Sequence, residues 1–150
     1  MAVMNAWAKQ KQGFTIVELL IVIVVIAILA AITIVAYNGI QSRAKDSSRD
    51  AGAKTIRTAL DLYKTDNGGY PNACGGVNIG CNVTNLASYL VPTYTSSLPN
   101  DPDTSTSFLY VLATGNQGYG LRVNYQTKAQ CQYQVGSGTN PSWWSGLALC

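Results

Sequence analysis

The side chains able to carry out chemistry in this sequence are few, and histidine is missing from them. Without histidine the chain lacks the commonest general base and the commonest metal ligand. A serine or cysteine nucleophile activated by histidine is therefore excluded, and neither a serine–lysine pair nor a pair of carboxylates stands in for it. We predict that the protein is not an enzyme and that it uses no cofactor.

The four cysteines are the residues best suited to covalent chemistry, and they are Cys74, Cys81, Cys131 and Cys150. An even number of cysteines in a region rich in Gly, Ser and Asn is typical of exported, disulfide-bonded domains. A zinc site is the alternative, but its close cysteine pairs are usually separated by about two to four residues. Here six and eighteen residues separate them, which favours disulfides. Three connectivities are open, and proximity favours Cys74–Cys81 and Cys131–Cys150.

The element that must position everything else is a long apolar segment. Charged residues make up 11% of the chain and hydrophobic residues 47%, about half the charge of an ordinary soluble domain. The apolar excess lies in residues 19–37, LLIVIVVIAILAAITIVAY, and no charged residue occurs between Glu18 and Arg43. Because about 20 apolar helical residues cross the hydrocarbon core of a bilayer, we predict a transmembrane helix. Lys9 and Lys11 place its start on the cytoplasmic side.

The remaining charge of the chain is nearly balanced. The net charge is +3, and without Lys9 and Lys11 eight basic residues stand against seven acidic ones. This balance gives no indication of a specific nucleic-acid partner.

Beyond Tyr37 the pattern becomes that of an amphipathic helix, which should end near Asn67 because two glycines and a proline follow. Two acidic residues, Asp46 and Asp50, precede a basic residue by three or four positions, an arrangement that supports a helix. We expect this charged face to be solvated or to lie between subunits. The apolar positions at helical spacing are Ile40, Ala44, Ala51, Ile56, Ala59, Leu60 and Tyr63.

The C-terminal part predicts a small β domain. Residues 84–90 are expected to form a short helix, and strands are expected at 108–113, 119–125 and 130–135. In the second strand Tyr119, Leu121, Val123 and Tyr125 alternate with Gly120 and polar residues, which indicates one buried face. Three or four antiparallel strands packed on the long helix are the expected head.

The residues at the mouth of the apolar segment, KQGFTIVE from Lys11 to Glu18, resemble the class III signal of type IV prepilins and pseudopilins. In that family a prepilin peptidase cuts after a glycine and methylates the new N-terminal residue, and a glutamate follows four residues later. The resemblance implies cleavage between Gly13 and Phe14 and N-methylation of Phe14. It also implies an assembly role for Glu18, whose carboxylate would pair with the amine of Phe14 in the same or a neighbouring subunit.

The expected fold class is therefore α+β, a type IV pilin-like lollipop with a long N-terminal helix packed against a small antiparallel β-sheet head. We expect a removed leader at 1–13 and a transmembrane or filament-core helix at 14–38. The amphipathic half of the same helix is expected at 39–67, and a globular head with a disulfide-closed C-terminal loop at 68–150.

Two further stretches are similar to the family. The loop closed by Cys131 and Cys150 looks like the C-terminal disulfide loop of many type IV pilins. The stretch LPNDP at residues 98–102 is similar to one in major pseudopilins of type II secretion, which bind calcium nearby. That similarity implies calcium at Asp101 and Asp103, but we favour a plain turn and no metal. For the pair Trp143-Trp144 we expect packing in the core or against another subunit.

These features favour a structural protein. The leading hypothesis is a type IV pilus subunit that is stored in the cytoplasmic membrane and polymerised into a surface filament for adhesion, twitching motility or DNA uptake. Its expected partners are copies of itself, a prepilin peptidase, an assembly platform and the membrane. The alternative is a pseudopilin of a type II secretion or competence system. A second alternative is a membrane-tethered binding domain, which would need neither the cleavage site nor Glu18.

Overall fold

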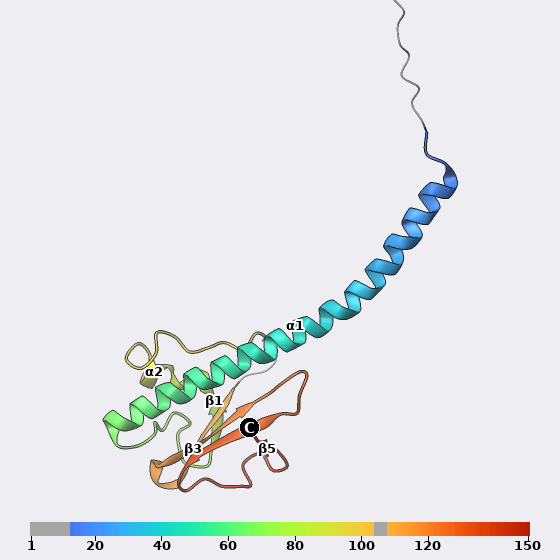
Figure 1. The fold of residues 1–150 in the computed structure, drawn as a ribbon. Helices are drawn as coiled ribbons and strands as arrows, with labels where there is room; N and C mark the ends of the chain where they lie inside the picture. Colours follow the sequence, from blue (N-terminus) through green and yellow to red (C-terminus); the bar gives the residue numbers. More distant parts are fainter. Residues whose placement is uncertain (1–12, 104–107) are drawn as a thin grey trace, which may run out of the picture. The chain divides into compact units, whose positions relative to one another are not determined.

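The computed structural model describes residues 13–103 and 108–150, so all of the expected leader except Gly13 lies outside the described residues. The chain forms two compact units, Met1–Gly39 and Ile40–Cys150, and helix α1 (Ile16–Asn67) contributes to both (Figure 1). The later elements are β1 (Gly80–Asn82), the 3-10 helix η1 (Val83–Leu86), α2 (Ala87–Leu90), β2 (Leu109–Leu112), the 3-10 helix η2 (Thr114–Asn116), β3 (Gly118–Val123), β4 (Cys131–Gly136) and β5 (Ala148–Leu149).

The first unit consists of the apolar part of α1. Every described side chain from Phe14 to Ile34 is exposed, and α1 is the one helix within the described part of the chain that is long and apolar enough to cross a membrane. A helix that is hydrophobic on all sides is stable only when lipid or other protein surrounds it. This unit therefore needs an environment that the single chain does not supply.

The second unit is an α+β domain, which confirms the predicted fold class. Its five strands lie in the order β1-β2-β3-β4-β5, and the first three pairings are antiparallel. The main core lies between the sheet and the amphipathic part of α1. Its fully buried members include Ile56 and Leu60 from the helix and Tyr110, Leu112 and Leu121 from the strands.

The sheet differs from the expected antiparallel one at its last edge, because β5 pairs with β4 in parallel. After β4 the chain forms a long loop and returns to the start of that strand, where Cys131 lies opposite Ala148. Because β5 begins beside the first residue of β4, it can pair along β4 only by running in the same direction. The short strands β1 and β5 were not predicted, because three and two residues are too few to show an alternating pattern.

The outer face of the sheet is also buried, although the sequence predicted one buried face for β3. Val111 and Ala113 form a second apolar cluster there with Trp143. A Cβ atom on Gly120 would lie 2.8 Å from the ring of Trp143 and 3.1 Å from that of Trp144, so glycine is needed where the tryptophans cross the strand. The C-terminal loop thus covers this face, and Trp143 is packed as expected.

In the first turns of the amphipathic part of α1, the buried face differs from the predicted one. Ile40, Ala44 and Ala51 are exposed, whereas the charged residues Asp46 and Arg49 are buried. The later predicted positions Ile56, Ala59 and Leu60 are buried and Tyr63 is partly buried, because there the helix lies on the sheet core. The helix ends at Asn67 as predicted, and Gly68 adopts a φ of 76°, which glycine tolerates at a helix C-terminus.

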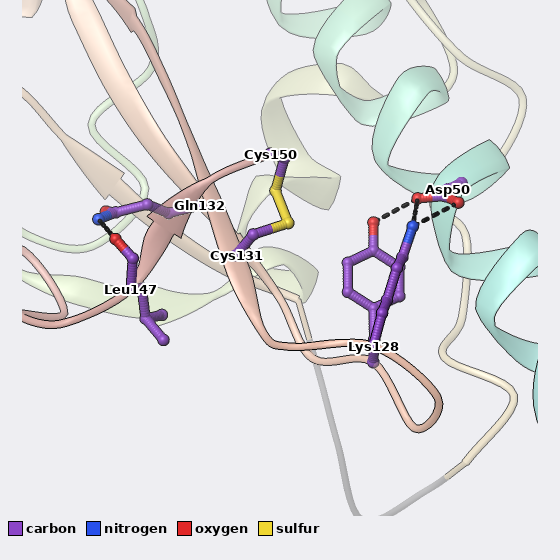
Figure 2. Close-up of a disulfide and its surroundings, with 7 residues drawn as sticks. Asp50, Lys128, Cys131, Gln132, Leu147 and Cys150 are labelled. Carbon is purple, nitrogen blue, oxygen red and sulfur yellow. Dashed lines mark hydrogen bonds and ion pairs between the residues drawn. A yellow bond between two sulfur atoms is a disulfide. The ribbon is translucent and has the colours of Figure 1, made fainter.

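Two aspartates one turn apart on α1 hold the loop between β3 and β4. The Asp46 carboxylate accepts hydrogen bonds from the backbone amides of Gln126 and Thr127, both at 2.8 Å, and from the Thr127 hydroxyl at 2.6 Å. Asp50 accepts from the Tyr125 hydroxyl and forms an ion pair with Lys128 at 3.0 Å (Figure 2). Asp50 therefore links α1 to the loop that follows β3.

The Asp46 contacts have an electrostatic consequence. Burial by itself raises the pKa of the Asp46 carboxyl. Hydrogen bonds from Thr127, from the amide of Gln126 and from Arg49 lower this pKa by a larger amount, so that the net value is about 2. A carboxyl whose pKa is lower in the folded chain than in the unfolded chain stabilises the fold at every pH above its pKa in the unfolded chain. That stability is lost as the pH falls through the folded value.

We predict that Gly120→Ala destabilises the head by about 1–3 kcal/mol, because the new methyl group meets Val111 and both tryptophans. The change is to be measured by denaturant unfolding of the full chain in detergent, followed by tryptophan fluorescence. The matched control is Gly80→Ala in β1, whose Cβ meets nothing within 4 Å and should leave stability unchanged or slightly higher. Equal effects of the two substitutions would contradict the packing described for the outer face.

We also predict that Asp46→Asn costs about 2 kcal/mol of unfolding free energy at neutral pH, since a shift of about two pKa units is worth that much. The difference from the wild type should shrink as the pH falls from about 4 to about 2, where the native carboxylate takes up its proton. Denaturant unfolding at several pH values measures this difference. The control is Asp66→Asn, at an exposed position of the same helix, which should leave the unfolding free energy at neutral pH nearly unchanged.

Candidate processing and assembly site

The expected cleavage site lies in an accessible, non-helical segment. Gly13 and Phe14 precede the first residue of α1, and the Phe14 side chain is 91% exposed. Proteases act most readily on exposed, non-helical backbone, so this geometry suits cleavage between Gly13 and Phe14.

Thr15 and Glu18 form a capping box at the start of α1. The Thr15 hydroxyl accepts a hydrogen bond from the Glu18 amide at 3.2 Å. In return the Glu18 carboxylate accepts from the Thr15 amide at 2.8 Å and from its hydroxyl at 2.7 Å. This reciprocal pair satisfies backbone donors that a helix start otherwise leaves free. The sequence pattern Thr-x-x-Glu before an apolar run is a signal that could have identified Thr15, which our sequence analysis did not single out.

The capping box leaves part of the Glu18 carboxylate available. Both bonds from Thr15 end on the same oxygen, Oε2, whereas a carboxylate can accept about four hydrogen bonds. A negative charge in the first turn is favoured by the helix dipole. When the surrounding apolar surface is covered, however, an unpaired carboxylate costs several kcal/mol. A cation placed at the helix start would remove that cost, and cleavage after Gly13 would create one at the amine of Phe14.

The structure brings the cysteines together in the two pairs that are nearest in sequence. Cys74 joins Cys81, with their Cα atoms 5.4 Å apart, and Cys131 joins Cys150 at 5.0 Å. The second bridge fastens the chain end to β4 (Figure 2). The Gln132 side chain donates to the Leu147 carbonyl at 3.1 Å beside it. The loop that carries the tryptophans is therefore fixed at both ends.

The two aspartates considered for calcium are occupied by other partners. Asp101 accepts hydrogen bonds from Nε and Nη2 of Arg49, and its Oδ1 also accepts from the amide of Asp103. The Asp103 carboxylate accepts from the side chain of Gln126 at 3.0 Å. Within residues 13–103 and 108–150 no three His, Cys, Asp or Glu side chains gather as a metal site. Because calcium needs about six to eight oxygen ligands, these residues do not fit the ion.

The sequence analysis did not identify Arg49 of α1 as a partner of the turn at Asp101. Arg49 is completely buried and donates from Nη1 to Asp46 at 2.9 Å and from Nη2 to Asp101 at 2.8 Å. The hydrogen bond to Asp101 raises the pKa of Arg49, and burial lowers it by less. The spacing of Asp46 and Arg49 indicated their helical pair, but the partner 52 residues further along the chain left no local signal.

Comparison with known proteins matches two families. Residues 8–34 match the prokaryotic N-terminal methylation motif, and residues 37–127 match type II secretion system (T2SS), protein G. The first match covers Gly13, Phe14 and Glu18, and the second covers the amphipathic part of α1 and the sheet up to the loop after β3. No solved structure gives a significant match.

Three similar proteins carry the name type II secretion system core protein G. The one from Escherichia coli K12 is 33% identical over 103 residues, which is 66% of this chain and 70% of the relative. That of Aeromonas hydrophila is 32% identical over 98 residues, or 63% and 68%. That of Pseudomonas aeruginosa is 36% identical over 69 residues, or 46% and 49%. The chain therefore belongs to the type II secretion system protein G family, within the pilin and pseudopilin group that shares the N-terminal methylation motif.

Proposed function

We propose that the protein is a pseudopilin, a structural subunit that polymerises into the filament of a type II secretion system. The observation that carries this proposal is the continuous succession of the two family matches, over residues 8–34 and 37–127. The exposed apolar start of α1 gives the proposal a physical basis, since it suits both storage in a membrane and later packing against other copies.

Processing is the first step of the proposed cycle. A prepilin peptidase cuts the exposed bond after Gly13 on the cytoplasmic side, and the amine of Phe14 is methylated. The mature chain then starts two residues before α1, with a positive amine close to the carboxylate of Glu18. In the membrane this carboxylate lies at the interface, where water solvates it.

Assembly is the second step, and in this step the Glu18 carboxylate needs a positively charged partner. When α1 leaves the lipid and packs among other copies, its apolar surface remains covered but water is lost around the carboxylate. Pairing with the Phe14 amine of a neighbouring subunit then stabilises the correct axial register, because a displaced neighbour leaves the charge unpaired. Thr15 holds the carboxylate in place during this step through the capping box.

The proposed location is the inner membrane before assembly and the periplasm afterwards. The surface pilus of our leading hypothesis has less direct support than its alternative, because the similar proteins are named for type II secretion. A type IV pilus subunit remains the second candidate, favoured by the C-terminal loop that Cys131 and Cys150 close.

Intact mass of the protein from its native membrane tests the processing step. We expect a chain that begins at Phe14, carries one added methyl group and lacks four hydrogens because of its two disulfides. A chain that retains residues 1–13, or one cut beyond Ala31, would refute a pseudopilin and favour a tethered or secreted binding domain.

Deletion of the gene tests the machine that the filament serves. We expect the deletion strain to retain exoproteins in the periplasm while surface pili and twitching motility persist. Loss of pili with normal secretion would refute the secretion assignment and favour the pilus subunit, since only one of the two filaments would then depend on this chain.

For Glu18 we predict that Glu18→Gln lowers the yield of assembled filament at least about tenfold, because a lost charge pair of only about 1.4 kcal/mol has that effect. Glutamine keeps an oxygen that can accept the Thr15 hydrogen bonds, so the helix start is retained while the charge is removed. Thr15→Val is the complementary variant, since it removes the hydroxyl but keeps the charge. Filament yield is to be measured by cross-linking and shearing.

The two variants separate the charge from the cap. We expect Thr15→Val to reduce assembly less than Glu18→Gln, with both proteins present in the membrane at the wild-type level. Normal filament yield from Glu18→Gln would contradict the proposed pairing with Phe14.

A further inference from the structure

We propose that Arg49 is the built-in cation of the head: its guanidinium group neutralises Asp46 and Asp101 in the role that a structural metal ion could otherwise have, so that the head folds without calcium. The proposal concerns the second unit alone and does not depend on which filament the protein forms.

The first observation is the geometry of the contact at Asp101. Nε of Arg49 lies 3.0 Å from Oδ2, and Nη2 lies 2.8 Å from Oδ1. Two parallel hydrogen bonds between a guanidinium and a carboxylate form the strongest and most directional of the charged pairs. The Arg49 side chain is fully buried, and 6% of the Asp101 side chain is exposed, so water screens this pair weakly.

The second observation is that the same guanidinium joins segments that are distant in sequence. Its Nη1 atom donates to Oδ1 of Asp46, and Asp46 in turn receives the backbone amides of Gln126 and Thr127. Helix α1, the turn at Asp101 and the loop after β3 therefore meet around one positive charge. Structural metal ions hold carboxylates from separate loops in the same way.

The third observation concerns the cost of replacing the arginine. Calcium could use the Asp101 oxygens only by displacing Nε and Nη2, which would leave a buried guanidinium with one partner fewer. An unpaired buried charge is strongly unfavourable. The small cavity beside Asp101, about 60 Å³, has no other carboxylate in its lining and is bounded by Asn82, Thr84, Asn100 and apolar neighbours. The site therefore lacks the negative charge that calcium binding requires.

The experiment is thermal unfolding of the full chain in detergent with calcium, with magnesium, and with a chelator. For the wild type we expect the same Tm in all three conditions. A wild-type Tm that rises with calcium, or falls with the chelator, would overturn the proposal. This measurement needs no variant and decides the matter even if variants fail to fold.

Arg49→Gln tests the role of the guanidinium. We expect its Tm to fall by roughly 10 °C or more, because two buried carboxylates lose their cation. We expect neither calcium nor magnesium to recover the loss, because the two freed carboxylates supply too few oxygen ligands for calcium. The matched control is Arg43→Gln, an exposed position on the same helix, whose Tm should change by less than about 2 °C.

Two outcomes with Arg49→Gln would count against the proposal. One is a Tm no lower than that of Arg43→Gln, which would show that the guanidinium does not hold the head together. The other is a folded variant whose Tm is restored to the wild-type value by calcium, because these residues would then fit the ion. If Arg49→Gln does not fold, Arg49→Lys is used, since lysine keeps the charge but cannot form two parallel bonds and should lower the Tm by a smaller amount.

Discussion

The exposed apolar surface at the start of α1 is the constraint on which the rest of the molecule depends. Its described side chains from Phe14 to Ile34 are all exposed in the single chain, and these residues form no polar face that water could solvate. Such a surface requires lipid or other protein around it, which agrees with the proposed cycle of storage in a membrane followed by assembly. On our proposal, Thr15 and Glu18 matter because they are polar groups of the described helix start and can specify one arrangement among many.

Three carboxylates of the chain differ in where their partner comes from. Asp46 and Asp101 are buried in the head, and the same chain supplies their cation at Arg49. Glu18 is exposed, its hydrogen bonds within residues 13–103 and 108–150 are with Thr15, and its carboxylate retains capacity for a further partner. A satisfied carboxylate fixes one folded structure, whereas an incompletely satisfied one favours association with a molecule that brings a positive charge. The head is therefore complete by itself, and the helix start is not.

The sequence predicted the features that depend on local patterns. The end of α1 at Asn67, the three central strands and the α+β class all follow from periodicity and from glycine and proline signals. It did not predict the buried charges on α1, because hydrophobic spacing assigned Ile40 and Ala44 to the core in their place. Asp101 meets Arg49 across 52 residues, and no pattern in one sequence records such a contact. Burial of the outer face of β3 was missed for the same reason, since the covering tryptophans come from the far end of the chain.

The covered outer face limits how the head can contribute to a filament. Trp143 lies on Val111 and Ala113, and the bridge from Cys131 to Cys150 fixes the end of the loop that carries it. The sheet therefore offers no broad apolar face at this side to another subunit. Most of the exposed large apolar side chains among the described residues lie on α1, and packing among them is non-specific because it has no direction. On our proposal, the specificity of assembly comes from charges and hydrogen bonds, with the Glu18 carboxylate first among them.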